Sequence, residues 1–133
     1  MMRLKNCHNY QDFRRLAQKR LPSPIFNYID GAADDEITYR RNTTAFNDVD
    51  LIPNVLAGVE SVDMSTTIFG KKLEMPLYCA PTALQRLFHY DGERAVSKAA
   101  EKFGTMFGIS SLSTVSAEEI DSMISTPKMF QFY

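Results

Sequence analysis

The chain has 133 residues, of which 44% are hydrophobic, and its 15 basic and 16 acidic residues nearly balance. This length and apolar content indicate a globular protein of about one domain and argue against a disordered chain. The near-neutral charge offers no basic surface for nucleic acid, so we expect no nucleic-acid partner.

The cysteines and the first residues exclude further classes. Cys7 and Cys79 lie far apart, without CxxC spacing or a histidine cluster, so the sequence predicts neither a metal site nor a redox pair. Cys79 is expected to be a small core residue. Residues 1–10 lack the apolar region of a secretory signal, and no run reaches the roughly 18 apolar residues of a membrane helix. We expect a cytoplasmic protein, with peripheral attachment to the inner membrane left open.

The first 48 residues predict a helical lead-in. Asn9 or Asp12 can cap a first helix that runs through Arg20, and Pro22 and Pro24 end it. Its apolar residues recur on one helical face, at Tyr10, Phe13, Leu16 and Ala17.

Two further helices are predicted before residue 49. A short helix over 24–30 is expected to end at Gly31 in the left-handed conformation. A third helix is expected from Asp34 to about Asn47, because the acidic residues 34–36 suit the positive end of a helix.

The rest of the chain predicts strands and then strand–helix alternation. Residues 49–74 form a β-rich segment with a hairpin centred on Gly70-Lys71. From residue 75 onward, apolar runs alternate with amphipathic stretches, giving strands at 75–83, 105–111 and 129–133 and helices at 91–103 and 116–124. No Gly/Ser-rich linker interrupts the chain, so we expect residues 1–133 to belong to a single domain.

Strand–helix alternation implies parallel strands with right-handed crossovers. An open sheet that binds a dinucleotide would carry G-x-G-x-x-G after its first strand, but residues 80–85 contain no glycine. A (β/α)8 barrel needs about 250 residues. The predicted fold class is therefore α/β, with N-terminal helices followed by about the first three β/α units of an incomplete (β/α)8 TIM barrel. A last strand with no helix after it favours a fragment.

Candidate site residues follow from this topology, because working residues of such folds lie where strands end. The rule selects Pro81-Thr82-Ala83, Ser110-Ser111, Gln131 and Tyr133. These groups are uncharged, and the Gln131 amide can donate and accept at once, as the edge of a flavin or pyrimidine requires. From pattern alone, polar residues that merely end strands are the more frequent alternative.

Ordered blocks of sequence carry a family resemblance. They are NYIDGAADDE at 27–36, DMSTTIFG at 63–70, MPL at 75–77, APTA at 80–83, DGE at 91–93, ISS at 109–111, EE at 118–119 and FQFY at 130–133. Together they resemble the FMN-dependent L-2-hydroxy acid oxidising family, which includes glycolate oxidase, L-lactate dehydrogenase and mandelate dehydrogenase. The resemblance runs from about residue 9 to residue 133.

The resemblance implies FMN at the C-terminal mouth of a barrel. It assigns the peptide at Pro81, Thr82 and Ala83 to the reactive N5 edge of the flavin. It assigns Ser110 to the flavin ring and Gln131 to the pyrimidine edge of that ring.

The resemblance also implies that Tyr28 and Tyr133 face the substrate, one bonding its carboxylate and the other near its hydroxyl. The alternative for Tyr28 is packing between helices, for which Phe26 is the better candidate. Asp30, Asp34 and Asp35 are interpreted as helix N-caps rather than as a catalytic cluster.

Neither His8 nor His89 is assigned as a catalytic base. The histidine base, a lysine and the carboxylate-binding arginines of the family are expected beyond Tyr133, so no catalytic residue is predicted within residues 1–133. Leu112 stands where several oxidases carry tryptophan, and Phe132 replaces a common leucine, which leaves oxidase and dehydrogenase both open.

The implied activity is FMN-dependent oxidation of a lactate-like L-2-hydroxy acid to the 2-keto acid. Oxygen, a quinone or a cytochrome would accept the electrons, and the complete protein would form a tetramer. Two alternatives stay open: an inactive truncated chain, and another FMN barrel such as a type 2 isopentenyl diphosphate isomerase.

Overall fold

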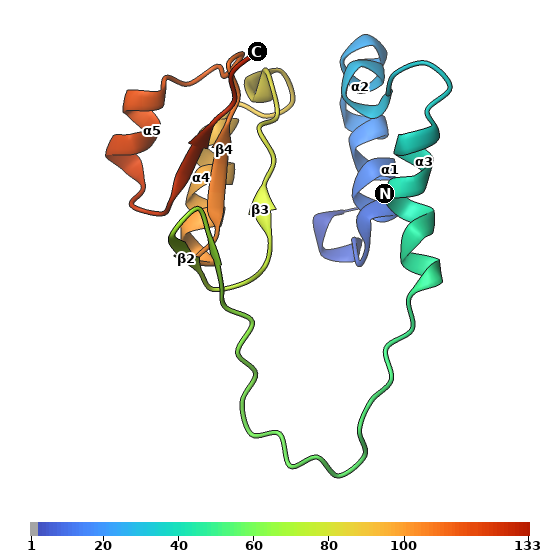
Figure 1. The fold of residues 1–133 in the computed structure, drawn as a ribbon. Coiled ribbons are helices and arrows are strands. Elements are labelled where there is room, and N and C mark those ends of the chain that lie inside the picture. Colours follow the sequence, from blue (N-terminus) through green and yellow to red (C-terminus); the bar gives the residue numbers. More distant parts are fainter. Residues whose placement is uncertain (1–2) are drawn as a thin grey trace. The chain divides into compact units, whose positions relative to one another are not determined.

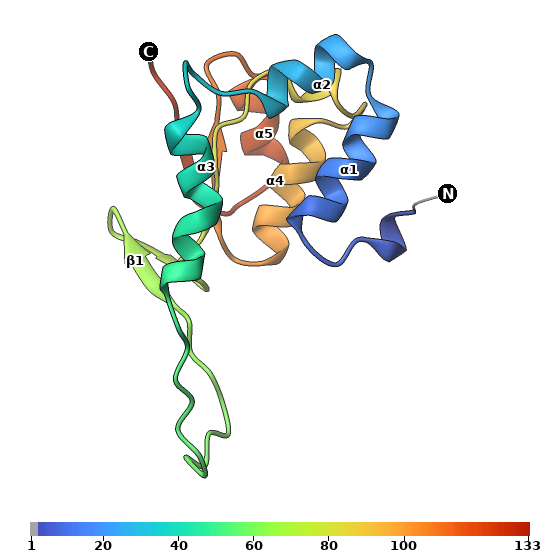
Figure 2. The same ribbon diagram turned by 90° about the vertical axis from the view of Figure 1, so that its right-hand side faces the viewer.

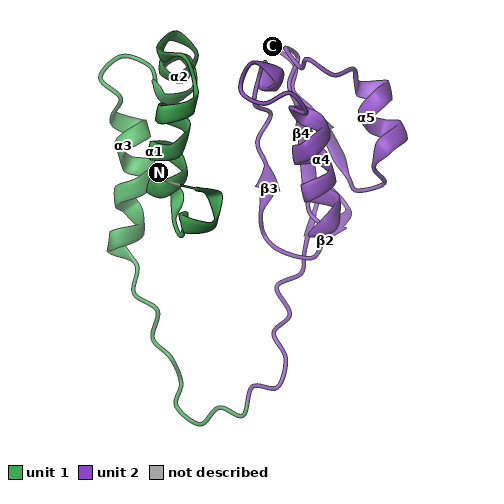
Figure 3. Ribbon diagram, turned by 180° about the vertical axis from the view of Figure 1, so that it is seen from behind, with its two compact units in different colours: residues 1–58 green, residues 59–133 purple. Residues whose placement is uncertain are grey.

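The computed structural model describes residues 3–133 (Figure 1). The chain divides into two compact units, Met1–Gly58 and Val59–Tyr133, which are coloured separately in Figure 3. Among the described residues, the helices of the lead-in lie in the first unit and every strand lies in the second. Whether these units belong to one domain of a larger protein stays a prediction.

Within residues 3–58, the first unit contains three α-helices and two short 3-10 helices. Their bounds are η1 Leu4–Asn6, α1 Tyr10–Arg20, α2 Ser23–Asp30, α3 Ile37–Thr44 and η2 Ala45–Asp48. The predicted cap of α1 is confirmed, because the Asn9 side chain accepts a hydrogen bond of 3.0 Å from the Asp12 N–H. The helix ends at Arg20, and the next residue, Leu21, is extended.

The end of α2 differs from the prediction. Gly31 is extended, with φ −78° and ψ 165°, and not left-handed. Its N–H donates to the Asn27 carbonyl at 3.1 Å, and a Cβ at this position would stand 3.0 Å from that same oxygen. Glycine is thus useful here for a close approach and not for a positive φ.

The start of α3 is also corrected. Asp34 and Glu36 both have positive φ, so the backbone turns at these residues and the helix begins at Ile37, three residues later than predicted. Glu36 occupies the N-cap position without a side-chain cap bond, so the prediction that Asp34 and Asp35 cap a helix is wrong. The Glu36 carboxylate instead accepts from the Ala32 N–H at 3.3 Å.

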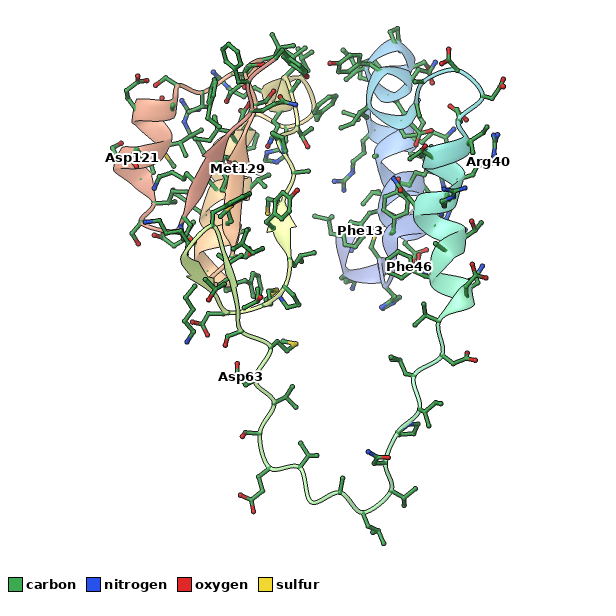
Figure 4. The ribbon with its side chains drawn as sticks, in the orientation of Figure 1. Phe13, Arg40, Phe46, Asp63, Asp121 and Met129 are labelled. Carbon is green, nitrogen blue, oxygen red and sulfur yellow. The ribbon has the colours of Figure 1, made fainter. Side chains whose placement is uncertain are left out.

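The first unit has a small core. Leu16 and Phe26 are its buried apolar side chains. Phe13, which the sequence places on the same face of α1 as Leu16, stays half exposed, as does Tyr10. Phe13 and Phe46 are both labelled in Figure 4.

The second unit begins with the predicted hairpin. Strand β1 (Thr66–Ile68) pairs antiparallel with β2 (Lys71–Leu73), and Ile68 lies opposite Lys71. The turn residues are therefore Phe69 and Gly70, one position earlier than predicted. Both have positive φ, at 49° and 72°, as in the type I′ turns that match the twist of a hairpin.

A parallel three-stranded sheet follows, in the order β3-β4-β5. Its strands are β3 Tyr78–Cys79, β4 Met106–Ile109 and β5 Lys128–Phe130, with η3 Gln85–Leu87, α4 Glu93–Lys102 and α5 Ala117–Met123 in the crossovers. The predicted alternation is confirmed, although each strand is shorter than predicted. The described residues form the open start of an α/β alternation and no closed barrel.

The core of the second unit lies between this sheet and its two helices. It consists of Ala100, Phe107, Ile109, Val115, Ile120 and Ile124. Helix α4 contacts β3, β4 and α5, and Figure 2 shows α4 and α5 near each other. The Arg94 Nε–Glu119 Oε1 ion pair of 2.5 Å joins the two helices. Asp121, labelled on α5 in Figure 4, pairs with Lys128 Nζ at 3.0 Å.

The strands are tied together where they begin. The Glu74 N–H, just after β2, donates to the Gly104 carbonyl at 2.9 Å. Two buried hydroxyls act beside it: Thr105 donates to the Leu77 carbonyl, and Thr126 donates to the Thr105 carbonyl at 2.5 Å.

No helix among residues 3–133 is long and apolar enough to cross a membrane.

Candidate functional site

Polar side chains meet where β4 and β5 end. Ser110 follows β4 directly, Gln131 follows β5, and the Ser110 Oγ donates to the Gln131 Oε1 at 3.1 Å. The backbone continues the pairing of the strands, since the Gln131 N–H donates to the Ile109 carbonyl at 2.8 Å. The structure therefore brings together two residues that the sequence predicts for one site.

Hydrogen bonds fix the orientation of this pair. Ser110 is 2% exposed, and its Oγ accepts from the Leu112 N–H at 3.1 Å while it donates to Gln131. The bond engages the amide oxygen of Gln131, which lies on a partly exposed residue, and the amide nitrogen carries two more N–H donors. The pair can thus present donors to a ligand without a net charge.

The loop after β3 lies against β4 because Gly108 has no side chain. A Cβ at Gly108 would stand 2.7 Å from the Cys79 carbonyl oxygen and 2.9 Å from the Pro81 nitrogen. Only glycine permits an approach this close. Pro81, Thr82 and Ala83 follow at this point and are partly buried.

Sequence reasoning missed the role of Gly108. The signal that could have found it is a glycine inside a strand pattern, which often marks a close backbone approach. This contact places the start of the 81–83 segment beside β4, which ends at Ile109, directly before Ser110.

The loops after β3 and β4 are also joined by hydrogen bonds. The Leu84 N–H donates to the Leu112 carbonyl at 3.1 Å, and the Arg86 N–H donates to the Thr114 Oγ1 at 3.3 Å. The segment that holds residues 81–83 is therefore linked directly to the segment that holds Ser110.

Glu93, the first residue of α4, was matched by the sequence blocks but given no role. It is 1% exposed, and its carboxylate accepts from the Thr114 N–H at 2.8 Å and from the Thr114 Oγ1 at 2.6 Å. Burial is the largest single influence and raises the pKa of the Glu93 carboxyl, but the hydrogen bonds to it, from Thr114 foremost and also from Ser113 and its own backbone, together lower this pKa below the ordinary value. Its charge also suits the N-terminus of a helix.

The two predicted substrate tyrosines are exposed. Tyr28, on α2, is 57% exposed, whereas Phe26 on the same helix is buried and fills the packing role that the alternative assigned to Tyr28. Tyr133 is 80% exposed and lies two residues after Gln131. Tyr28 belongs to the first unit and Tyr133 to the second, so a shared role of these two phenols stays a prediction.

Asp30 is not a helix cap, in contrast to the prediction. It ends α2, and its carboxylate accepts from Arg14 Nε at 2.5 Å and from Arg14 Nη2 at 2.7 Å. The guanidinium holds the pKa of the Asp30 carboxyl below its usual range. This bidentate pair joins α1 to the helix that carries Tyr28.

The histidines and Cys79 make structural contacts. The backbone N–H of His8 donates to the Asp12 carboxylate at 3.0 Å, and the His89 Nδ1 accepts from the Asp91 N–H at 3.2 Å. Cys79 is partly buried and packs against the core, and burial raises the pKa of its thiol. Within residues 3–133, no group of three or more His, Cys, Asp or Glu residues is placed to hold a metal ion.

The donor set at the strand ends fits a neutral, planar heteroaromatic ring. It combines the Gln131 amide, which the Ser110 hydroxyl orients, with the backbone of a tight loop, and the nearby Glu93 carboxylate is taken up by Thr114. Such groups bind and orient a ring edge but supply no strong base. The arrangement therefore fits the isoalloxazine ring that the sequence resemblance implies.

Comparisons with known proteins agree with this fit. A sequence model for FMN-dependent dehydrogenases matches residues 17–133. Glycolate oxidase 1 of Oryza sativa subsp. indica is 38% identical over 125 residues, which are 94% of this chain and 34% of the relative. The chain thus spans about a third of the length of the curated relatives it matches.

Solved structures are similar as well. A soluble mutant of the membrane-associated (S)-mandelate dehydrogenase from Pseudomonas putida matches with 34% identity and a TM-score of 0.84, over 94% of this chain and 36% of that one. A Pediococcus acidilactici protein described as a lactate oxidase matches with 32% identity and a TM-score of 0.85, over 96% and 36%. Because the family's sequence model matches residues 17–133, which are most of this chain, the chain belongs to the FMN-dependent dehydrogenases.

Proposed function

We propose that this chain serves an enzyme that uses FMN to oxidise an L-2-hydroxy acid, with lactate as the substrate, to the 2-keto acid. The observation that carries the proposal is the hydrogen-bonded pair of Ser110 and Gln131 beside the 81–83 loop, at the strand ends. Bound FMN would supply the acceptor for the hydride equivalent that leaves the α-carbon.

In this proposal each candidate residue binds or orients. The backbone at Pro81, Thr82 and Ala83 would hold the reactive edge of the flavin, Ser110 would lie against the ring, and Gln131 would bond its pyrimidine edge. Tyr28 and Tyr133 are proposed to bind the substrate, because a phenol donates to a carboxylate without adding charge. Their exposure leaves both rings accessible.

We place the catalytic base and the carboxylate-binding arginines outside residues 1–133. His8 belongs to the first unit, and the His89 Nδ1 is engaged by the N–H of its neighbour Asp91. We therefore propose that the 133 residues alone are inactive, with a chain that has no enzymatic role as the alternative.

The remaining features of the enzyme are proposed on family grounds. We propose a cytoplasmic tetramer that passes electrons to oxygen, a quinone or a cytochrome, with attachment to the inner membrane as an open alternative. A second reading, another FMN barrel such as an isopentenyl diphosphate isomerase, is disfavoured by the sequence block around Tyr28, which suits a hydroxy-acid carboxylate.

The test begins with the gene beyond the codon for Tyr133 and with the protein made from its full open reading frame. We expect bound flavin that L-lactate reduces, as seen by loss of its visible absorbance under anaerobic conditions. Glycolate, mandelate and an isoprenyl diphosphate serve as competing substrates. Flavin that no 2-hydroxy acid reduces would overturn the proposal.

A matched pair of variants links the activity to the site. Gln131→Ala removes the amide at the strand ends, and Gln18→Ala removes an exposed amide on α1. We expect Gln131→Ala to weaken FMN binding by about tenfold, the effect of losing one hydrogen bond to a ligand, and Gln18→Ala to leave it unchanged.

A further inference from the structure

Glu93 is the most deeply buried carboxylate in the described chain. A buried carboxylate is costly unless hydrogen bonds compensate its charge. Here both oxygens are used: Oε1 accepts from the Thr114 N–H at 2.8 Å, and Oε2 accepts from the Thr114 hydroxyl at 2.6 Å. Hydrogen bonds to a charged acceptor are shorter and stronger than neutral ones, so Glu93 holds Thr114 firmly.

Thr114 also forms a hydrogen bond with a second loop. Its hydroxyl donates to Glu93 and accepts from the Arg86 N–H at 3.3 Å. The Leu84 N–H donates to the Leu112 carbonyl at 3.1 Å and so binds the same two segments. One carboxylate therefore connects α4, the loop after β3 and the loop after β4.

Both connected loops carry candidate FMN residues. Pro81, Thr82 and Ala83 begin the loop after β3, and Ser110 begins the loop after β4. The flavin would have to meet these two loops in one relative placement, since a ring edge is bound only by donors held at the correct spacing. Glu93 itself is enclosed and engaged by Thr114, so it acts on a ligand only through these loops.

We propose that Glu93 is a positioning residue for the FMN site, acting through Thr114 to hold the two cofactor loops together. The proposal rests on the proposed function, because it takes FMN to be the ligand of these loops. In this role Glu93 neither contacts the flavin ring nor transfers a proton.

The structure offers a matched control at the opposite end of the strands. Thr126 is also buried, and its hydroxyl donates to the Thr105 carbonyl at 2.5 Å, where β4 and β5 begin. Thr114→Val and Thr126→Val remove the same hydroxyl group from the same unit, at a partly buried and a buried position respectively. Thr114→Val keeps the backbone N–H that bonds Glu93, so the fold retains half of the connection.

The test measures FMN affinity and amide hydrogen exchange in the protein made from the full open reading frame. We expect Thr114→Val and Glu93→Gln each to weaken FMN binding by about tenfold, the loss of one charge-assisted hydrogen bond, and Thr126→Val to change it less than about twofold. Without FMN, the Leu84 amide should exchange at least about tenfold faster in Thr114→Val and not in Thr126→Val.

The outcomes separate this proposal from the proposed function. FMN affinity that Thr114→Val and Glu93→Gln leave unchanged, in a protein that binds FMN, would overturn the positioning role alone. Equal weakening by Thr126→Val would also overturn it, because the effect would then follow general stability. A parent protein that binds no FMN would overturn the proposed function and this role together.

Discussion

At the scale of single residues, the second unit depends on a few residues that are buried or closely packed. Gly108 permits the approach of the 81–83 loop, and Ser110 orients the Gln131 amide. Glu93 keeps a carboxylate charge inside the protein by accepting two hydrogen bonds from Thr114.

The environment of Glu93 predicts a pH-dependent stability. Its folded-state pKa lies below the ordinary value, so the carboxylate contributes stability that is present above its unfolded pKa of about 4.3 and is lost as the pH falls through the folded-state pKa. Glu93→Gln should therefore lower the free energy of unfolding at neutral pH by about 1–3 kcal/mol, and by progressively less below about pH 4.

Urea unfolding measures this difference. Circular dichroism is the signal to follow, because the chain contains no tryptophan for fluorescence. Glu60→Gln changes an exposed carboxylate in the same unit and serves as the control. A loss in Glu93→Gln that stays constant from about pH 7 to pH 3 would contradict the expected role of the charge.

Local chemistry in the sequence predicts some side-chain contacts and misses others. Asn9 as a cap and Phe26 as a packed aromatic are confirmed, because both follow from chemistry within one or two turns of a helix. Asp30 was misinterpreted as a cap because its partner, Arg14, lies on another helix. A side chain whose partner is distant in sequence gives no local pattern to read.

At the scale of elements, short helices and strands are held by specific contacts between them. The pair of Arg14 and Asp30 joins α1 to α2, and the pair of Arg94 and Glu119 joins α4 to α5. Helices of seven to eleven residues are marginal by themselves in water, so such tertiary contacts decide their stability.

The contact between α1 and α2 can be tested by Asp30→Asn. The neutral amide loses the bidentate ion pair with Arg14, whose guanidinium is partly exposed, so we expect a loss of about 1 kcal/mol in the free energy of unfolding. The effect should shrink at high salt, because screening weakens a partly exposed pair. Asp50→Asn, at an exposed position of the same unit, should leave stability unchanged at either salt concentration.

At the scale of the whole chain, two compact units are joined through an exposed segment. Every residue from 49 to 64 is exposed, and the segment includes the large apolar side chains of Leu51, Ile52, Val55, Leu56, Val59, Val62 and Met64. An exposed backbone without helix or strand bonds is accessible to proteases.

Limited proteolysis should therefore cut this segment first. Thermolysin, which cleaves beside apolar residues, is expected to act between residues 49 and 64 before it acts at buried Leu16 or Phe107. Mass spectrometry of the early products would show two fragments close to the two units. First cuts inside α1 or α4 would show instead that the segment is protected in solution.

The sequence by itself determined the alternation of strands and helices, the α/β class and, through ordered blocks, membership in the FMN-dependent dehydrogenases. These follow from local signals, namely apolar periodicity, turn residues and caps. Only the tertiary structure decided that Ser110 bonds Gln131 and that Glu93 holds Thr114, pairs that stand 21 positions apart in the chain. The physical reason is that such contacts depend on strand order and on how each crossover helix packs, which no short window of sequence contains.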